Sequence, residues 1–145
     1  MKNKIVLILI LLTCFTSVAQ KKITWQDLSK VKFTDKYFAE YGDYFMYPSF
    51  SEEVKALSGK KVTITGYFLD IDPQGKLFIL SKGPMSACFF CGIGGPETAV
   101  EIQFAKKPPF KTDDIITVTG VLKLNKDDVE HFNYILTGSQ AILVN

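Results

Sequence analysis

The sequence predicts a mainly β protein: a small five-stranded Greek-key barrel of the OB type, with a short helix and an aromatic-rich N-terminal extension. After residue 60, apolar side chains recur at every second position in five successive segments, as in strands with one buried face. The first and fourth segments both carry Thr-Gly, and glycine inside a strand is typical of the bulges that let a sheet close. A β-sandwich or an open meander remains the alternative.

The five predicted strands are separated by turn residues and prolines. The first ends at the turn 72–75, and the third, which carries Val100, Ile102 and Phe104 on one face and Glu101 and Gln103 on the other, ends at Pro108-Pro109. We expect the fifth to be interrupted at Gly138. The predicted ranges are 62–69, 77–80, 98–104, 115–122, and 133–136 with 141–144.

Residues 20–60 form the aromatic-rich extension, which we expect to belong to the same domain as the barrel at 61–145. Residues 25–28 predict a helical turn, and residues 44–47 an extended piece that ends at Pro48. Ser51 is a suitable N-cap for a helix of about two turns, which Ser58-Gly59 ends and which packs through Val54 and Leu57 to close one end of the barrel.

The stretch 37–50 holds many of the aromatic side chains, and two interpretations are open. OB domains use aromatic side chains as a stacking platform for single-stranded nucleic acid. Here the balance of charges and the absence of arginine favour packing in the core instead.

The N-terminus predicts export. Lys2 and Lys4 precede an apolar run at 5–12 and small residues before Ala19, so residues 1–19 resemble a signal peptide cleaved after Ala19. We therefore expect a periplasmic or secreted protein without a transmembrane helix, because the apolar run is about half the length of a bilayer span. The alternative is a membrane-anchored lipoprotein with lipid on Cys14, although Thr13 suits that signal poorly.

The remaining chain is the size of one domain, and its charges cancel. Two of the 17 basic residues lie in residues 1–19, so 15 remain against 15 acidic residues. The chain contains no arginine, the side chain that grips phosphate with two parallel hydrogen bonds. Both features argue against nucleic acid as a partner.

One loop carries the candidate chemistry. Cys88 and Cys91 form a Cys-x-x-Cys pair between the second and third strands, and two thiolates at this spacing can bind one soft ion. Copper(I) needs only the two sulfurs, whereas zinc needs further donors. The candidates for those donors are His131 and Glu97 first, and then Glu130, Asp127 and Asp128.

Other interpretations of the cysteine pair stay open. A thiol-disulfide exchange factor uses the same spacing, but residues 92–96 cannot begin the helix that usually lowers the thiol pKa. A structural disulfide suits an oxidising compartment, and two buried reduced thiols are the remaining interpretation. His131 by itself is more typical of a solvated turn. The sequence shows no complete set of catalytic residues.

The chain resembles a family of uncharacterised exported bacterial proteins, some of them lipoproteins, through Trp25-Gln26-Asp27-Leu28, the segment 54–62, Thr65-Gly66-Tyr67 and the Ala87-Cys88 loop. Relatives carry Gly-Ala-Cys-Ile-His there; in this chain Phe90 replaces the histidine and Cys91 adds a sulfur. The resemblance implies metal handling. We therefore expect a non-catalytic binding protein for zinc or copper, with a metal ion or another envelope protein as its partner.

Overall fold

The computed structural model describes residues 20–72, 74 and 77–144. The predicted signal peptide, including Cys14, lies outside these residues. No helix in the described part of the chain is long and apolar enough to cross a membrane.

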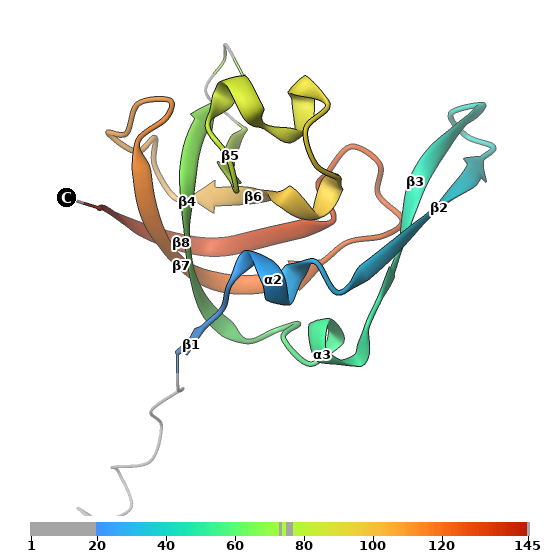
Figure 1. Cartoon of the computed structure of the whole chain (residues 1–145), viewed down its shortest axis with the longest axis horizontal. Coiled ribbons are helices and arrows are strands. Elements are labelled where there is room, and N and C mark those ends of the chain that lie inside the picture. The colour runs from blue at the N-terminus through green and yellow to red at the C-terminus, as the bar shows by residue number, and fades with distance from the viewer. Residues whose placement is uncertain (1–19, 73, 75–76, 145) are drawn as a thin grey trace, which may run out of the picture.

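Five strands form a closed barrel, as predicted (Figure 1). They pair in the order β4-β5-β6-β8-β7, and β7 pairs again with β4. Only β6 and β8 run parallel within this ring. This connectivity is that of a small OB-like barrel and not of a sandwich. The strands are β4 Lys61–Asp70, β5 Phe78–Ser81, β6 Ala99–Phe104, β7 Ile115–Leu124 and β8 Tyr134–Leu143.

The two Thr-Gly sites lie where backbone segments approach closely. A Cβ at Gly66 would stand 2.6 Å from the Ser81 carbonyl oxygen and 2.8 Å from the Trp25 ring. The Trp25 indole N–H donates to the Thr65 carbonyl over 2.9 Å and fixes the ring there. At Gly120 the register between β7 and β8 shifts, so this glycine marks the expected bulge.

The fifth strand differs from the prediction at Gly138. β8 is one continuous strand, in which Gly138 adopts a φ of +59° without ending the pairing. The interruption expected from the sequence is therefore a local irregularity opposite the Gly120 bulge. Glycine permits this conformation because it has no Cβ.

The N-terminal segment begins by pairing with the barrel and then adds two short helices. β1 Lys21–Lys22 runs parallel to the start of β4. α2 Trp25–Leu28 carries a capping box from Thr24, and α3 Glu52–Lys55 is capped by the predicted Ser51. Leu28, Val54 and Leu57 are buried in the barrel core.

Between the helices lies a hairpin that was not predicted from the sequence. β2 Val31–Phe38 and β3 Asp43–Phe50 form a two-stranded sheet that projects from the barrel (Figure 1). β3 runs through Pro48, although the sequence predicts that the extended segment ends there. β3 pairs only with β2 among the described strands, and an edge strand tolerates proline.

Core packing was also the wrong expectation for part of this aromatic stretch. The side chains of Tyr37, Tyr41 and Tyr44 are 52%, 45% and 65% exposed. Only the base of the hairpin reaches the core. There the rings of Phe50 and Tyr134 pack together, with 5.5 Å between their centroids. The projecting part of the hairpin therefore places aromatic side chains outside the barrel.

Burial occurs in two separate clusters. The larger cluster fills the barrel, and its members come from the barrel strands and the N-terminal segment. The smaller cluster, which we call the outer cluster, contains Leu69, Ile79, Cys88 and Ala99. Leu69 and Ile79 follow residues whose side chains point into the barrel, so the outer cluster lies on the outside of the wall.

Candidate functional site

The loop at 82–98 covers the outer face of β5 and β6. It contains three short 3₁₀ turns, and Cys88 from this loop packs into the outer cluster. OB domains bind nucleic acid on the corresponding face of their second and third strands. Here the protein's own loop occupies that face. The turns are η1 Met85–Ala87, η2 Phe89–Cys91 and η3 Pro96–Thr98.

The turn η2 brings the two predicted sulfurs together. The Cys91 N–H donates to the Cys88 carbonyl over 3.0 Å, and Gly92 ends the turn with a φ of +76°. The Sγ atoms of Cys88 and Cys91 lie 3.9 Å apart as free thiols. Cys88 is buried and Cys91 is exposed, so one sulfur is anchored in the wall and the other faces solvent.

The surroundings of Cys91 do not favour a reactive thiolate at that position. The Cys91 thiol lies 3.0 Å from the Met85 carbonyl oxygen, to which it donates. Its hydrogen bond with Cys88, together with desolvation and the neighbouring charge of a Cys88 thiolate, raises the pKa of Cys91. A raised pKa lowers the thiolate fraction at neutral pH, which is the opposite of what an exchange enzyme needs.

The other predicted ligands lie apart from the sulfurs. Among the described residues, no group of three or more His, Cys, Asp or Glu side chains is placed to hold an ion. The Glu97 carboxylate folds back toward Gly95, in the third 3₁₀ turn. His131 lies in the loop between β7 and β8, a predicted turn, and its side chain pairs with a carboxylate and not with the sulfurs.

That partner is Glu101, which the sequence analysis placed on the polar face of its strand. The Glu101 side chain is only 4% exposed and lies 3.0 Å from Nδ1 of His131. It also accepts from the Gln103 amide over 2.9 Å and from the Phe132 N–H over 3.3 Å. The hydrogen bond and the charge of Glu101 raise the pKa of His131.

The alternation of apolar and polar residues correctly separated the two faces of β6. It gave no indication that a loop covers the outer face. A single acidic residue among the apolar residues of a strand was the available hint. It could not indicate a partner 30 positions away in the sequence. Burial of Glu101 is therefore a consequence of how the loops fold over the barrel.

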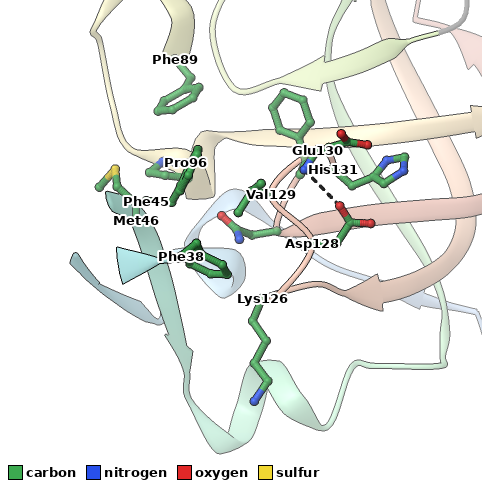
Figure 2. A pocket seen from close by; sticks show the side chains of 12 residues that line it. Phe38, Phe45, Met46, Phe89, Pro96, Lys126, Asp128, Val129, Glu130 and His131 are labelled. Carbon is green, nitrogen blue, oxygen red and sulfur yellow. Dashed lines mark hydrogen bonds between the residues drawn. The ribbon is translucent and has the colours of Figure 1, made fainter. Parts of the chain in front are cut away.

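A pocket of about 290 Å³ opens beside the loop at 82–98, which we call the cysteine loop. It lies between the projecting hairpin, Phe89 and Pro96 of the cysteine loop, and the loop that joins β7 to β8 (Figure 2). Phe89, the residue after Cys88, is part of its wall. The other lining residues are Phe38, Phe45, Met46, Pro96, Lys126, Asp128, Val129, Glu130, His131, Phe132 and Asn133.

The hairpin is tied to the β7–β8 loop next to this pocket. The Tyr47 hydroxyl donates to Asp127 over 3.1 Å, and the Lys36 ammonium lies 3.5 Å from the same carboxylate. That ammonium also lies over two rings, 4.0 Å from the centroid of Tyr47 and 4.9 Å from that of Phe38. These contacts hold the inner face of the hairpin toward the barrel.

Comparison with known proteins shows that the fold is similar to that of a solved structure. No family model matches the chain, and no curated protein matches it in sequence. The crystal structure of a DUF3299 family protein from Pseudomonas aeruginosa PAO1 is similar, with a TM-score of 0.56 and 17% identity over 88% of this chain and 97% of that one. DUF denotes a domain of unknown function, so the chain shares its fold with a member of an uncharacterised family.

Proposed function

We propose that this chain is an exported, non-catalytic binding protein that holds one soft metal ion, copper(I), between Cys88 and Cys91. The sulfur spacing supports this most directly. With bonds of about 2.3 Å, two thiolates on one ion stand about 3.8 Å apart in a tetrahedral arrangement and about 4.6 Å apart in the linear arrangement of two-coordinate copper(I). The two Sγ atoms lie 3.9 Å apart. Two-coordinate copper(I) would therefore move the two sulfurs apart by less than about 1 Å as it replaces the thiol protons.

Copper(I) suits this donor set better than zinc. Structural zinc sites have four protein ligands, and thiolate sulfur is a donor that copper(I) favours. The described residues bring no third His, Cys, Asp or Glu to the sulfurs, so zinc would require donors from a partner protein. One exposed sulfur would let such a partner deliver or remove the ion by ligand exchange.

The alternative of thiol-disulfide exchange has less support. An exchange enzyme attacks with a thiolate, whereas hydrogen bonding to Cys88 raises the pKa of Cys91. A metal ion instead displaces both protons on binding, so its affinity should increase as the pH rises. The same raised pKa is thus compatible with a metal site and unfavourable for exchange.

An anaerobic titration tests this function. Copper(I) is supplied from a coloured chelator to the reduced protein, and we expect one equivalent to transfer. Cys88→Ser and Cys91→Ser should each abolish transfer, whereas Ser86→Ala, on an exposed residue of the same loop, should leave it unchanged. Absence of transfer to the unmodified protein, or transfer that survives both cysteine substitutions, would refute the proposal.

A further inference from the structure

Two aromatic rings form a right-angled corner in the pocket beside the cysteine loop. The rings of Phe38 and Phe45 lie 5.7 Å apart between centroids, with an angle of 90° between their planes. They belong to facing strands of the hairpin, and both line the pocket (Figure 2). Phe89 and Phe132 line the same pocket. Perpendicular rings can present their electron-rich faces to one small guest from two directions.

The charged side chains in the pocket lining favour a cation. The loop between β7 and β8 contributes Asp128 and Glu130 to the pocket lining. No ion pair involves either carboxylate among the described residues; Oδ1 of Asp128 accepts only from the Glu130 N–H, at 3.0 Å. Lys126, although it lines the pocket, extends its ammonium away from the rings in Figure 2. The charge of a protonated His131 is balanced by Glu101.

The hairpin already holds an ammonium group in this manner. Lys36 Nζ lies over the rings of Tyr47 and Phe38 and 3.5 Å from the Asp127 carboxylate. The pocket has the same kinds of groups in its lining, with the rings of Phe38 and Phe45 on the hairpin side and the carboxylates of Asp128 and Glu130 on the side of the β7–β8 loop (Figure 2). An ammonium ion is attracted to the face of an aromatic ring, and a neighbouring carboxylate adds to the attraction.

We infer that this pocket binds a small organic ammonium ion. A volume of about 290 Å³ lies at the lower end of ligand pockets, which restricts the guest to a compact head group or a short amine. The site is distinct from the two sulfurs and goes beyond the proposed metal function. Its nearness to Phe89 means that a bound guest would lie against the residue next to Cys88.

Calorimetry with a cation and its neutral isostere tests the inference. Choline and 3,3-dimethylbutan-1-ol have the same shape, but only choline carries a charge, so both are titrated into the purified, metal-free protein. We expect choline to bind about tenfold more tightly than the alcohol, the order of magnitude of a partly desolvated cation–π contact. Equal affinities, or no binding of choline, would overturn the inference.

Substitutions then locate the binding. Phe45→Leu keeps an apolar side chain but removes a ring, and the exposed Glu130→Gln removes a charge with little effect on packing. Each should weaken choline binding several-fold and leave the alcohol unchanged. Tyr44→Leu, which removes a ring 65% exposed and paired with Tyr37 across the hairpin, is the matched control and should change neither. Choline binding that survives both Phe45→Leu and Glu130→Gln would show that this pocket is not the site.

Discussion

The inside of the barrel and the outer cluster bury similar side chains for different purposes. The inside is a continuous cluster of apolar residues from the barrel strands and both N-terminal helices. The outer cluster has four fully buried members, one of them a cysteine, and a loop covers it rather than a second sheet. Glu101, which pairs with the half-exposed His131, is also buried by loops. Most of the stabilising burial thus lies inside the barrel, whereas the cysteines and the Glu101–His131 pair, which could take part in chemistry, lie outside it.

The largest expected effect compares two neighbours on β5. Leu80 points into the barrel and Ile79 into the outer cluster, and both are fully buried. Leu80→Ala should lower the free energy of unfolding by about 2–5 kcal/mol, because the barrel cannot collapse onto the cavity. Ile79→Ala should cost less, since the loop at 82–98 can settle into the space. Urea unfolding measures both; an equal or greater loss for Ile79→Ala would contradict this division.

The second effect tests how the barrel closes. Gly66→Ala should cost about 1–3 kcal/mol, because its Cβ would meet backbone at Ser81 and the Trp25 ring. Gly120→Ala should cost less, since its Cβ would stand 2.9 Å from the Ser139 hydroxyl and 3.0 Å from the Thr137 carbonyl oxygen, both farther than the nearest atoms at Gly66. Thermal unfolding of the two variants shows which one loses more stability. A Gly66→Ala variant as stable as the unmodified protein would show that close packing does not require glycine at this position.

The barrel could be predicted from the sequence because its inward-facing residues are mostly apolar and recur at every second position. Val62, Ile64 and Phe68 alternate with residues that point out of the barrel. This period of two does not depend on what covers the outer face of the strand. The hairpin could not be recognised in the same way. Tyr37 and Tyr44 face each other on its exposed side, so apolar residues occupy both faces and the alternation that marks a half-buried strand is lost.

Part of the site was also accessible to sequence reasoning. Cys88 and Cys91 are three positions apart, so local spacing alone indicated that the sulfurs could meet. The Glu101–His131 pair and the pocket depend on loops that approach from distant parts of the chain. Such contacts leave no periodic signal in a single sequence.

A smaller effect concerns the pH dependence of stability near the outer cluster. Because Glu101 raises the pKa of His131, the folded protein keeps this proton to a higher pH than the unfolded chain does. The stabilisation is therefore complete below about pH 6.5 and is lost as the pH rises through the folded pKa. The His131 side chain is 46% exposed, so solvent screening limits the gain to about 1 kcal/mol.

His131→Gln provides the comparison for that prediction. Urea unfolding of the variant and the unmodified protein at several pH values should show the largest difference in acid and almost none at pH 9. A difference that grows with pH would mean that His131 is bound in its neutral form.

The smallest effect on stability separates the two cysteines. Cys91 is exposed, so Cys91→Ser should change the free energy of unfolding by less than about 0.5 kcal/mol. Cys88 is buried against Leu69 and Ile79, and a soluble thiol reagent should label it only after Cys91. Timed labelling followed by mass spectrometry gives the order, and faster labelling of Cys88 would contradict the placement of the loop.

Native mass spectrometry tests the central claim most directly. The protein is isolated without reductant or chelator, and its intact mass is compared with those of Cys88→Ser and Cys91→Ser. We predict one copper ion per chain, lost in both variants because each sulfur supplies one of two bonds. A metal-free chain two protons lighter than the reduced mass would show a disulfide instead and contradict the account of these cysteines as a metal site.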